Sequence, residues 1–127
     1  MATVHATKDN FNDLIEKHGI VLVDFWAEWC GPCKRFGPVF EAASEKHKDA
    51  CFVKVDTEEQ AELAGAFRIR SIPTLMVFRD QVLLFEQAGA LPPSALDELL
   101  EQVRGLDMDK VKKEIADEEA KQPPPNP

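Results

Sequence analysis

Basic residues are few in this chain of 127 residues. Lysine and arginine number 15 against 23 aspartates and glutamates, so the formal net charge is −8. Nucleic acids and anionic membranes would be repelled by such a surface. We therefore expect neither as a binding partner.

Long apolar runs and cysteines are also scarce. No apolar stretch is long enough to cross a membrane, and residues 1–7 lack the basic and apolar regions of a signal peptide. Three cysteines are too few for a disulfide-stapled secreted domain. With 44% apolar and 30% charged residues, the composition predicts one globular domain in the cytoplasm.

Two of the three cysteines form a Cys-x-x-Cys motif, Cys30 and Cys33. Half of a zinc site looks the same, but a closed zinc site usually needs four ligands. The chain has no second pair: its third cysteine is Cys51, and its histidines are scattered at His5, His18 and His47. We therefore expect no metal, and a purely structural disulfide is also a poor fit to so tight a loop.

The position of the motif favours thiol chemistry. An apolar run, Ile20 to Trp26, predicts a buried strand, and the residues from Pro32 to about Lys48 predict a helix. Thiols at a helix start face unpaired backbone N–H groups and the positive end of the helix dipole, which both favour thiolate. Because the thiolate is the nucleophile in disulfide exchange, the motif predicts a redox-active dithiol.

Asp24 interrupts the apolar run before the motif. A carboxylate inside a buried strand is costly unless it is paired or protonated, and burial raises its pKa. One interpretation is a salt bridge, with Lys54 on a neighbouring strand as the partner. The other, which we favour, is a proton acceptor beneath the cysteines.

The rest of the chain alternates between strand and helix patterns, which predicts an α/β fold with a mixed central sheet and helices on both faces. Further helices are expected after a cap at Thr7 or Asn10, after a capping box of Thr57 and Gln60, and after Pro92-Pro93-Ser94. A hairpin turn is expected at Asp80-Gln81, although glutamine suits a positive φ poorly. The further strands expected are residues 2–6, 51–56, 74–78 and 82–86.

Three short motifs together resemble the thioredoxin family. They are Asp24-Phe25-Trp26-Ala27, Trp29-Cys30-Gly31-Pro32-Cys33 and Ser71-Ile72-Pro73-Thr74, and the resemblance covers about residues 3–104. It implies the thioredoxin fold and a protein-disulfide reductase with no bound cofactor, recycled by a thioredoxin reductase. It also implies a monomer, with targets such as peroxiredoxins or ribonucleotide reductase.

The same resemblance implies roles for individual residues. Cys30, expected to be the more exposed thiol, would attack the target disulfide, and Asp24 would help to deprotonate Cys33. The Ile72–Pro73 bond would be cis. Lys54, Gly31 and Pro32 would modulate the site, and the target would contact Trp29, Ile72, Pro73 and Gly89.

Two questions stay open from sequence. The first is whether the thioredoxin-like site works as a reductant, as an oxidant or isomerase, or only as a binding subunit; Pro32, where those oxidant families carry histidine, favours a reductant. The second concerns residues 105–127, which follow the domain of residues 1–104. They predict a charged helix with a proline-rich tail, either a solvated appendage or a docking segment for a partner.

Overall fold

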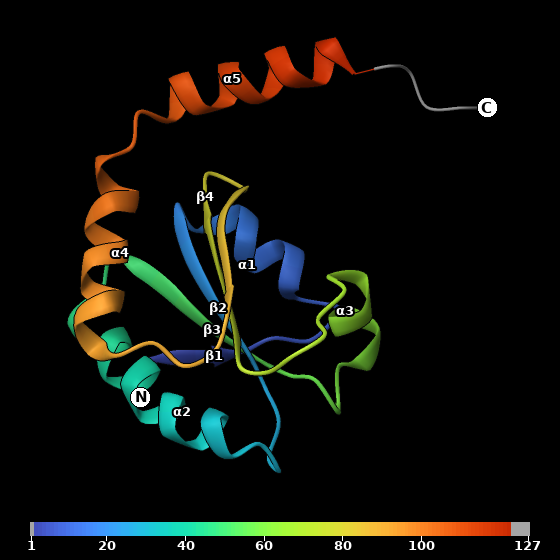
Figure 1. The fold of residues 1–127 in the computed structure, drawn as a ribbon, viewed down its shortest axis with the longest axis vertical. Coiled ribbons are helices and arrows are strands. Elements are labelled where there is room, and N and C mark those ends of the chain that lie inside the picture. Colours follow the sequence, from blue (N-terminus) through green and yellow to red (C-terminus); the bar gives the residue numbers. More distant parts are fainter. Residues whose placement is uncertain (1, 123–127) are drawn as a thin grey trace.

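A computed structural model describes residues 2–122 of the chain. Its centre is a five-stranded mixed sheet with the strand order β1-β3-β2-β4-β5 (Figure 1). β2 pairs in parallel with β3 and antiparallel with β4. The strands are β1 (Thr3–His5), β2 (Ile20–Trp26), β3 (Ala50–Asp56), β4 (Thr74–Arg79) and β5 (Val82–Ala88).

The central strand β2 divides the apolar core into two layers. Successive side chains of a strand point to opposite faces. Val21, Val23 and Phe25 join one buried cluster, whereas Ile20 and Leu22 join the other. By the same alternation, Asp24 lies on the face of Ile20 and Leu22.

Helices cover both faces of the sheet (Figure 1). α1 and α3 contribute buried residues to the cluster of Val21, and α2 and α4 contribute to the cluster of Leu22. This confirms the predicted fold class. The helices are α1 (Phe11–Lys17), α2 (Gly31–Lys46), α3 (Ala61–Ala66), α4 (Pro93–Gly105) and α5 (Met108–Lys121).

Of two expected helix caps, the one of α1 lies at one of its two candidate residues and the one of α3 does not. Asn10, not Thr7, occupies the N-cap position of α1. The predicted cap at Thr57 is wrong: its hydroxyl donates to the Trp26 carbonyl oxygen at 3.0 Å, and α3 begins only after Gln60. In the turn before α3, Asp56 accepts the backbone N–H groups of Glu58 at 2.9 Å and of Glu59 at 3.3 Å.

The extension after residue 104 contains the helix α5, as predicted, and no residue after 122 is described. The proline-rich tail expected at residues 122–127 therefore lies almost wholly outside the described residues. Among residues 2–122, no helix has the length and apolar character needed to cross a membrane.

Candidate active site

The cysteine pair lies where β2 leads into α2. Cys30 and Cys33 form a disulfide with a Cα–Cα separation of 5.2 Å. Cys30 is the N-cap residue of α2, and its Sγ accepts a hydrogen bond from the backbone N–H of Cys33 at 3.2 Å. Pro32 occupies the first turn, where a missing N–H removes no helical hydrogen bond. The same N–H and the helix dipole would stabilise a thiolate on Cys30 once the disulfide is reduced.

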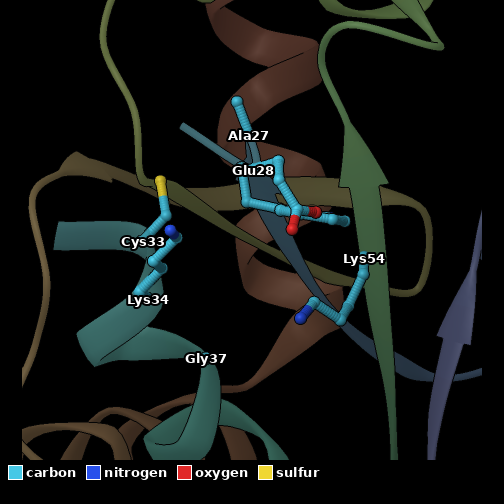
Figure 2. A pocket seen from close by; sticks show the side chains of 7 residues that line it. Ala27, Glu28, Cys33, Lys34, Gly37 and Lys54 are labelled. Atoms are coloured by element: carbon cyan, nitrogen blue, oxygen red, sulfur yellow. The ribbon is translucent and has the colours of Figure 1, made fainter. Parts of the chain in front are cut away.

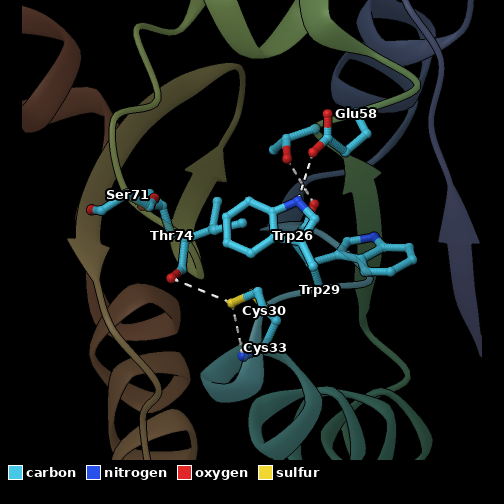
Figure 3. Close-up of a disulfide and its surroundings, with 9 residues drawn as sticks. Trp26, Trp29, Cys30, Cys33, Glu58, Ser71 and Thr74 are labelled. Carbon is cyan, nitrogen blue, oxygen red and sulfur yellow. Dashed lines mark hydrogen bonds between the residues drawn. A yellow bond between two sulfur atoms is a disulfide. The ribbon is translucent and has the colours of Figure 1, made fainter.

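The two sulfur atoms have different surroundings. Both cysteine residues are 4% exposed in this disulfide form, and the expectation that Cys30 is the more exposed thiol stays a prediction. Cys30 Sγ lies 3.6 Å from the Ile72 carbonyl oxygen, whereas Cys33 lines a pocket that it shares with Lys54. Figure 3 shows the backbone nitrogen of Cys33 directed at Cys30 Sγ.

That pocket has a volume of about 190 Å³. Figure 2 shows the Cys33 and Lys54 side chains on opposite walls of it, with Ala27 and Glu28 between them. Trp26, Lys34 and Gly37 complete the lining. The volume is enough for several water molecules.

Asp24 is fully buried, on the α2 side of the sheet. Neither of its carboxylate oxygens has a hydrogen-bond partner among the described residues. Burial raises the pKa of Asp24 to about 7, and the positive charge of Lys54 opposes that rise. A carboxyl group with this pKa can accept and return a proton near neutral pH.

Lys54 is the register partner of Asp24 on the neighbouring parallel strand. A salt bridge between the two was one sequence-based interpretation, and among the described residues no such ion pair forms. The Lys54 ammonium lies instead 4.9 Å from the centroid of the Trp26 ring, in a cation–π contact at the pocket wall. It therefore acts on Asp24 only through space.

The loop before β4 carries the predicted cis bond, between Ile72 and Pro73. Gly89 is brought to the same place, because its backbone N–H donates to the Pro73 carbonyl oxygen at 2.8 Å. Gly89 has a φ of 101°, a conformation that residues with a side chain rarely adopt. Pro73 itself is buried, whereas Gly89 is exposed.

Trp29 is the most prominent apolar residue beside the disulfide, with 69% of its surface exposed. Its indole N–H donates to Glu58 Oε1 at 2.6 Å. Trp29 and Ile72 line a shallow groove of about 340 Å³ that runs along α3. The exposed backbone of Gly31 and the ring of Pro32 lie at the start of α2.

Sequence reasoning missed Glu58 and Glu28. Glu58 orients the Trp29 ring, and Glu28 lines the pocket beside Cys33. The only signal for Glu58 was that an indole N–H generally needs an acceptor, which does not say which acidic residue supplies it. No group of three or more metal-ligating side chains comes together within residues 2–122.

Comparison with known proteins agrees with this geometry. The sequence pattern of the Thioredoxin family matches residues 2–102. A putative thioredoxin 2 of Streptomyces coelicolor is 56% identical over 119 residues, which cover 94% of this chain and 89% of the relative. The thioredoxin of Bacillus subtilis is 43% identical, covering 79% of this chain and 96% of the relative.

Solved structures give the same result. A mutant thioredoxin from Halobacterium salinarum superposes with a TM-score of 0.77 at 34% identity, covering 82% of this chain and 92% of that one.

The alignment with the Streptomyces coelicolor relative is long enough to include most of α5, whereas the family pattern ends before it. Thioredoxins carry no prosthetic group, and family membership implies a thioredoxin reductase and disulfide-containing targets as partners. With a Cys30–Cys33 disulfide at the start of α2, this chain belongs to the thioredoxin family and is a thiol–disulfide oxidoreductase.

Proposed function

We propose that the protein reduces disulfides of target proteins, with Cys30 as the attacking thiol and Cys33 as the resolving thiol. The Cys30 thiolate attacks one sulfur of the target disulfide, forming a mixed disulfide and releasing a target thiolate, which takes up a proton. The Cys33 thiolate then attacks Cys30 Sγ. This step forms the Cys30–Cys33 disulfide, breaks the mixed disulfide and leaves the target with two more electrons.

The observation that carries this proposal is the contrast between the two sulfur surroundings. Cys30 accepts the N–H of Cys33 and lies beside the carbonyl of Ile72, at the side of the exposed Trp29. Cys33 faces the pocket shared with Lys54. The first sulfur is therefore placed for a target and the second for a proton transfer.

In this proposal Asp24 receives the proton of Cys33. Its support is the unpaired, buried carboxylate and its pKa of about 7. A water molecule in the pocket would relay the proton, since the strand of Asp24 runs behind the pocket wall. Lys54 modulates the proton affinity of Asp24 through its charge, and Gly31 and Pro32 set the geometry of the first helical turn.

The target would lie across Trp29, Ile72, Pro73 and Gly89. The backbone around Ile72 would pair with an extended peptide as an added strand. Gly89 supports close approach, because nothing lies within 4 Å of the position its Cβ would take. Pro73 is buried and its carbonyl oxygen accepts the N–H of Gly89, so in this proposal Pro73 acts by shaping the loop that presents Ile72 to the target.

The same proposal includes the kind of reductase, the targets and the oligomeric state. A flavoprotein thioredoxin reductase would return electrons to the disulfide in the cytoplasm. The protein would act as a monomer on targets such as peroxiredoxins or ribonucleotide reductase. A mostly apolar contact surface beside the thiols suits short-lived encounters with several proteins.

The separate roles of Cys30 and Cys33 can be tested by trapping the mixed disulfide with a target. Cys33→Ser should form a stable mixed disulfide with insulin through Cys30, seen as a shift on a non-reducing gel. Cys30→Ser should form little adduct, and both variants should lose insulin reduction. Cys51→Ser is the matched control, because this buried cysteine lies on β3 away from the disulfide, and its activity should stay within twofold. Adduct formation through Cys33 in Cys30→Ser at an equal rate would contradict the assignment.

The direction of electron flow needs a separate measurement. An equilibrium titration against dithiothreitol, read by the fluorescence of Trp26 and Trp29, gives the reduction potential of the pair. We expect a potential more reducing than the glutathione pool, as a reductase requires. A potential at or above that pool would favour the oxidant or isomerase, and the absence of a two-electron step would favour a binding subunit.

A further inference from the structure

The helix α5 is attached to the body of the protein by a specific clamp. The Arg79 guanidinium, on β4, donates to the carbonyl oxygens of Val103, Arg104 and Leu106 at 2.6, 3.3 and 2.9 Å. Val103 and Arg104 belong to the last turn of α4, and the Val103 carbonyl oxygen also accepts the backbone N–H of Leu106 at 3.4 Å. The clamp therefore fixes the direction in which the chain leaves α4.

The first turn of α5 is also fixed. Asp107 caps the helix by accepting the backbone N–H of Lys110 at 3.2 Å. Met108 is 6% exposed, and Lys112 Nζ lies 3.7 Å from Asp80 Oδ2 in the hairpin turn. Figure 1 shows the rest of α5 extending from this attachment, outside the layers of helix and sheet. The helix is thus an anchored arm.

The apolar stripe of the arm is covered by the body at Met108 and becomes exposed further along the helix. Met108, Val111 and Ile115 lie on one face at helical spacing. Ile115 is 39% exposed, and the open surface beside it is bordered by other residues of α5 and by Gln122. We call the set Val111, Glu114, Ile115, Glu118 and Glu119 the α5 face.

The negative charges of the α5 face indicate the charge that a binding partner should carry. Three carboxylates border its apolar centre: Glu114, Glu118 and Glu119. Two lysines of the same helix are engaged, Lys112 with Asp80 and Lys121 with Glu118 at 4.0 Å. A second copy of the same face would bring carboxylates together, and an anionic membrane would be repelled.

We propose that the α5 face binds a cationic amphipathic segment of a partner protein. Apolar side chains of the partner would pack on Val111 and Ile115, and its lysines or arginines would pair with Glu114, Glu118 and Glu119. This docking site lies apart from the disulfide, so it would bring a chosen partner to the redox site without taking part in the chemistry.

The proposal can be tested with the full chain and a synthetic helical peptide that has leucine on one face and lysine on the others. We expect chemical shift changes in a ¹⁵N NMR spectrum to concentrate on residues 111–122, with weaker binding as salt is added. Ile115→Ala should weaken binding at least fivefold. Val4→Ala is the matched control, because Val4 is 38% exposed on the sheet edge opposite β5, and it should change affinity less than twofold.

The charge requirement has its own control. Glu114→Gln/Glu118→Gln/Glu119→Gln should weaken peptide binding at least tenfold, and a peptide with glutamate in place of lysine should not bind. The triple variant Asp9→Asn/Glu16→Gln/Glu59→Gln removes the same charge from exposed positions outside α5 and should change affinity less than threefold. Equal weakening by both triples would overturn the proposal, since attraction to the net charge alone would then explain binding.

Self-association is the remaining outcome to separate. Sedimentation of the full chain should show a monomer, and a dimer that Ile115→Ala dissociates would assign the α5 face to a second copy and overturn the proposal. Insulin reduction should be unchanged in every α5 variant. Failure of peptide binding with normal insulin reduction would thus reject the docking site and leave the redox function standing.

Discussion

At the residue scale, Asp24 is the group whose protonation most affects the folded state. In the folded protein burial raises the pKa of Asp24 to about 7 from its ordinary value of 3.8. Below about pH 4 the carboxyl is protonated in both the folded and the unfolded chain. As the pH rises to 7, the unfolded chain releases this proton while the folded protein keeps it, so the free energy of unfolding falls.

This sign gives a prediction for Asp24→Asn. A shift of about three pKa units corresponds to at most about 4 kcal/mol lost by the wild type between pH 4 and pH 7. Asp24→Asn should not lose this free energy. In urea unfolding of the oxidised form, the free energy of unfolding of the variant should therefore rise relative to that of the wild type as the pH increases, and the variant should be the more stable protein at pH 8.

A carboxylate with the opposite shift provides the control. The Lys46 ammonium and the His47 ring hold the pKa of Asp97 below its usual range. Asp97→Asn should therefore lower stability at pH 8 and leave it little changed near pH 3. If Asp24→Asn kept the wild-type pH dependence, the pKa of Asp24 would not be raised by folding, and its carboxylate would be too weak a base to hold a proton at neutral pH.

At the element scale, two turns place residues with side chains where glycine is favoured. Asp80 and Gln81 in the β4–β5 hairpin have φ values of 49° and 70°, as a tight hairpin of this hand requires. Arg68 has a φ of 55° at the end of α3. There the N–H of Ile69 donates to the Ala64 carbonyl oxygen at 3.1 Å and that of Arg68 to Gly65 at 3.0 Å, a Schellman motif that starts the loop toward Pro73.

Gln81→Gly should raise the free energy of unfolding by about 1 kcal/mol. Gln81 has a left-handed backbone conformation, which costs a residue with a Cβ about 1 to 2 kcal/mol and which glycine adopts without this cost. The measurement is urea unfolding of the oxidised protein. Gln87→Gly is the matched control: the same substitution in the extended strand β5 should lower stability by about 0.5 to 1 kcal/mol. Stabilisation by both substitutions, or by neither, would argue against strain at Gln81.

At the scale of the whole molecule, the redox site and α5 are separate. The family pattern ends at residue 102, and α5 contacts the body through Met108 and the Lys112–Asp80 pair at the hairpin turn. The disulfide lies at the start of α2, whereas the Arg79 clamp holds the end of α4. The two parts therefore share no residue.

Truncation after Leu106 should consequently leave insulin reduction within about twofold of the full chain. This cut keeps the Leu106 carbonyl that Arg79 binds, and it removes the buried Met108, so stability should fall by about 1 to 2 kcal/mol. Activity assays should be run well below the melting temperature. A large loss of activity at full folding would contradict the division of the chain at this point, which stays a prediction.

Local sequence patterns were sufficient to predict the elements with strong signals. The uninterrupted apolar run of β2, the helix that begins at the cysteine pair, and the exposed helix of the extension follow from nearest-neighbour preferences and periodicity. The fold class followed from their order along the chain. The motifs at Trp29 and at Ile72 also identified the family and predicted the cis bond that the structure contains.

The contacts between residues that are far apart in the sequence became known from the three-dimensional structure alone. It gave both cysteines the same small exposure, and it placed Lys54 over Trp26 instead of in a salt bridge with Asp24. It also selected Glu58 as the partner of Trp29 and Arg79 as the clamp on α4. Each of these contacts joins segments far apart in the chain, and their geometry depends on packing and on burial of charge, which no local sequence pattern encodes.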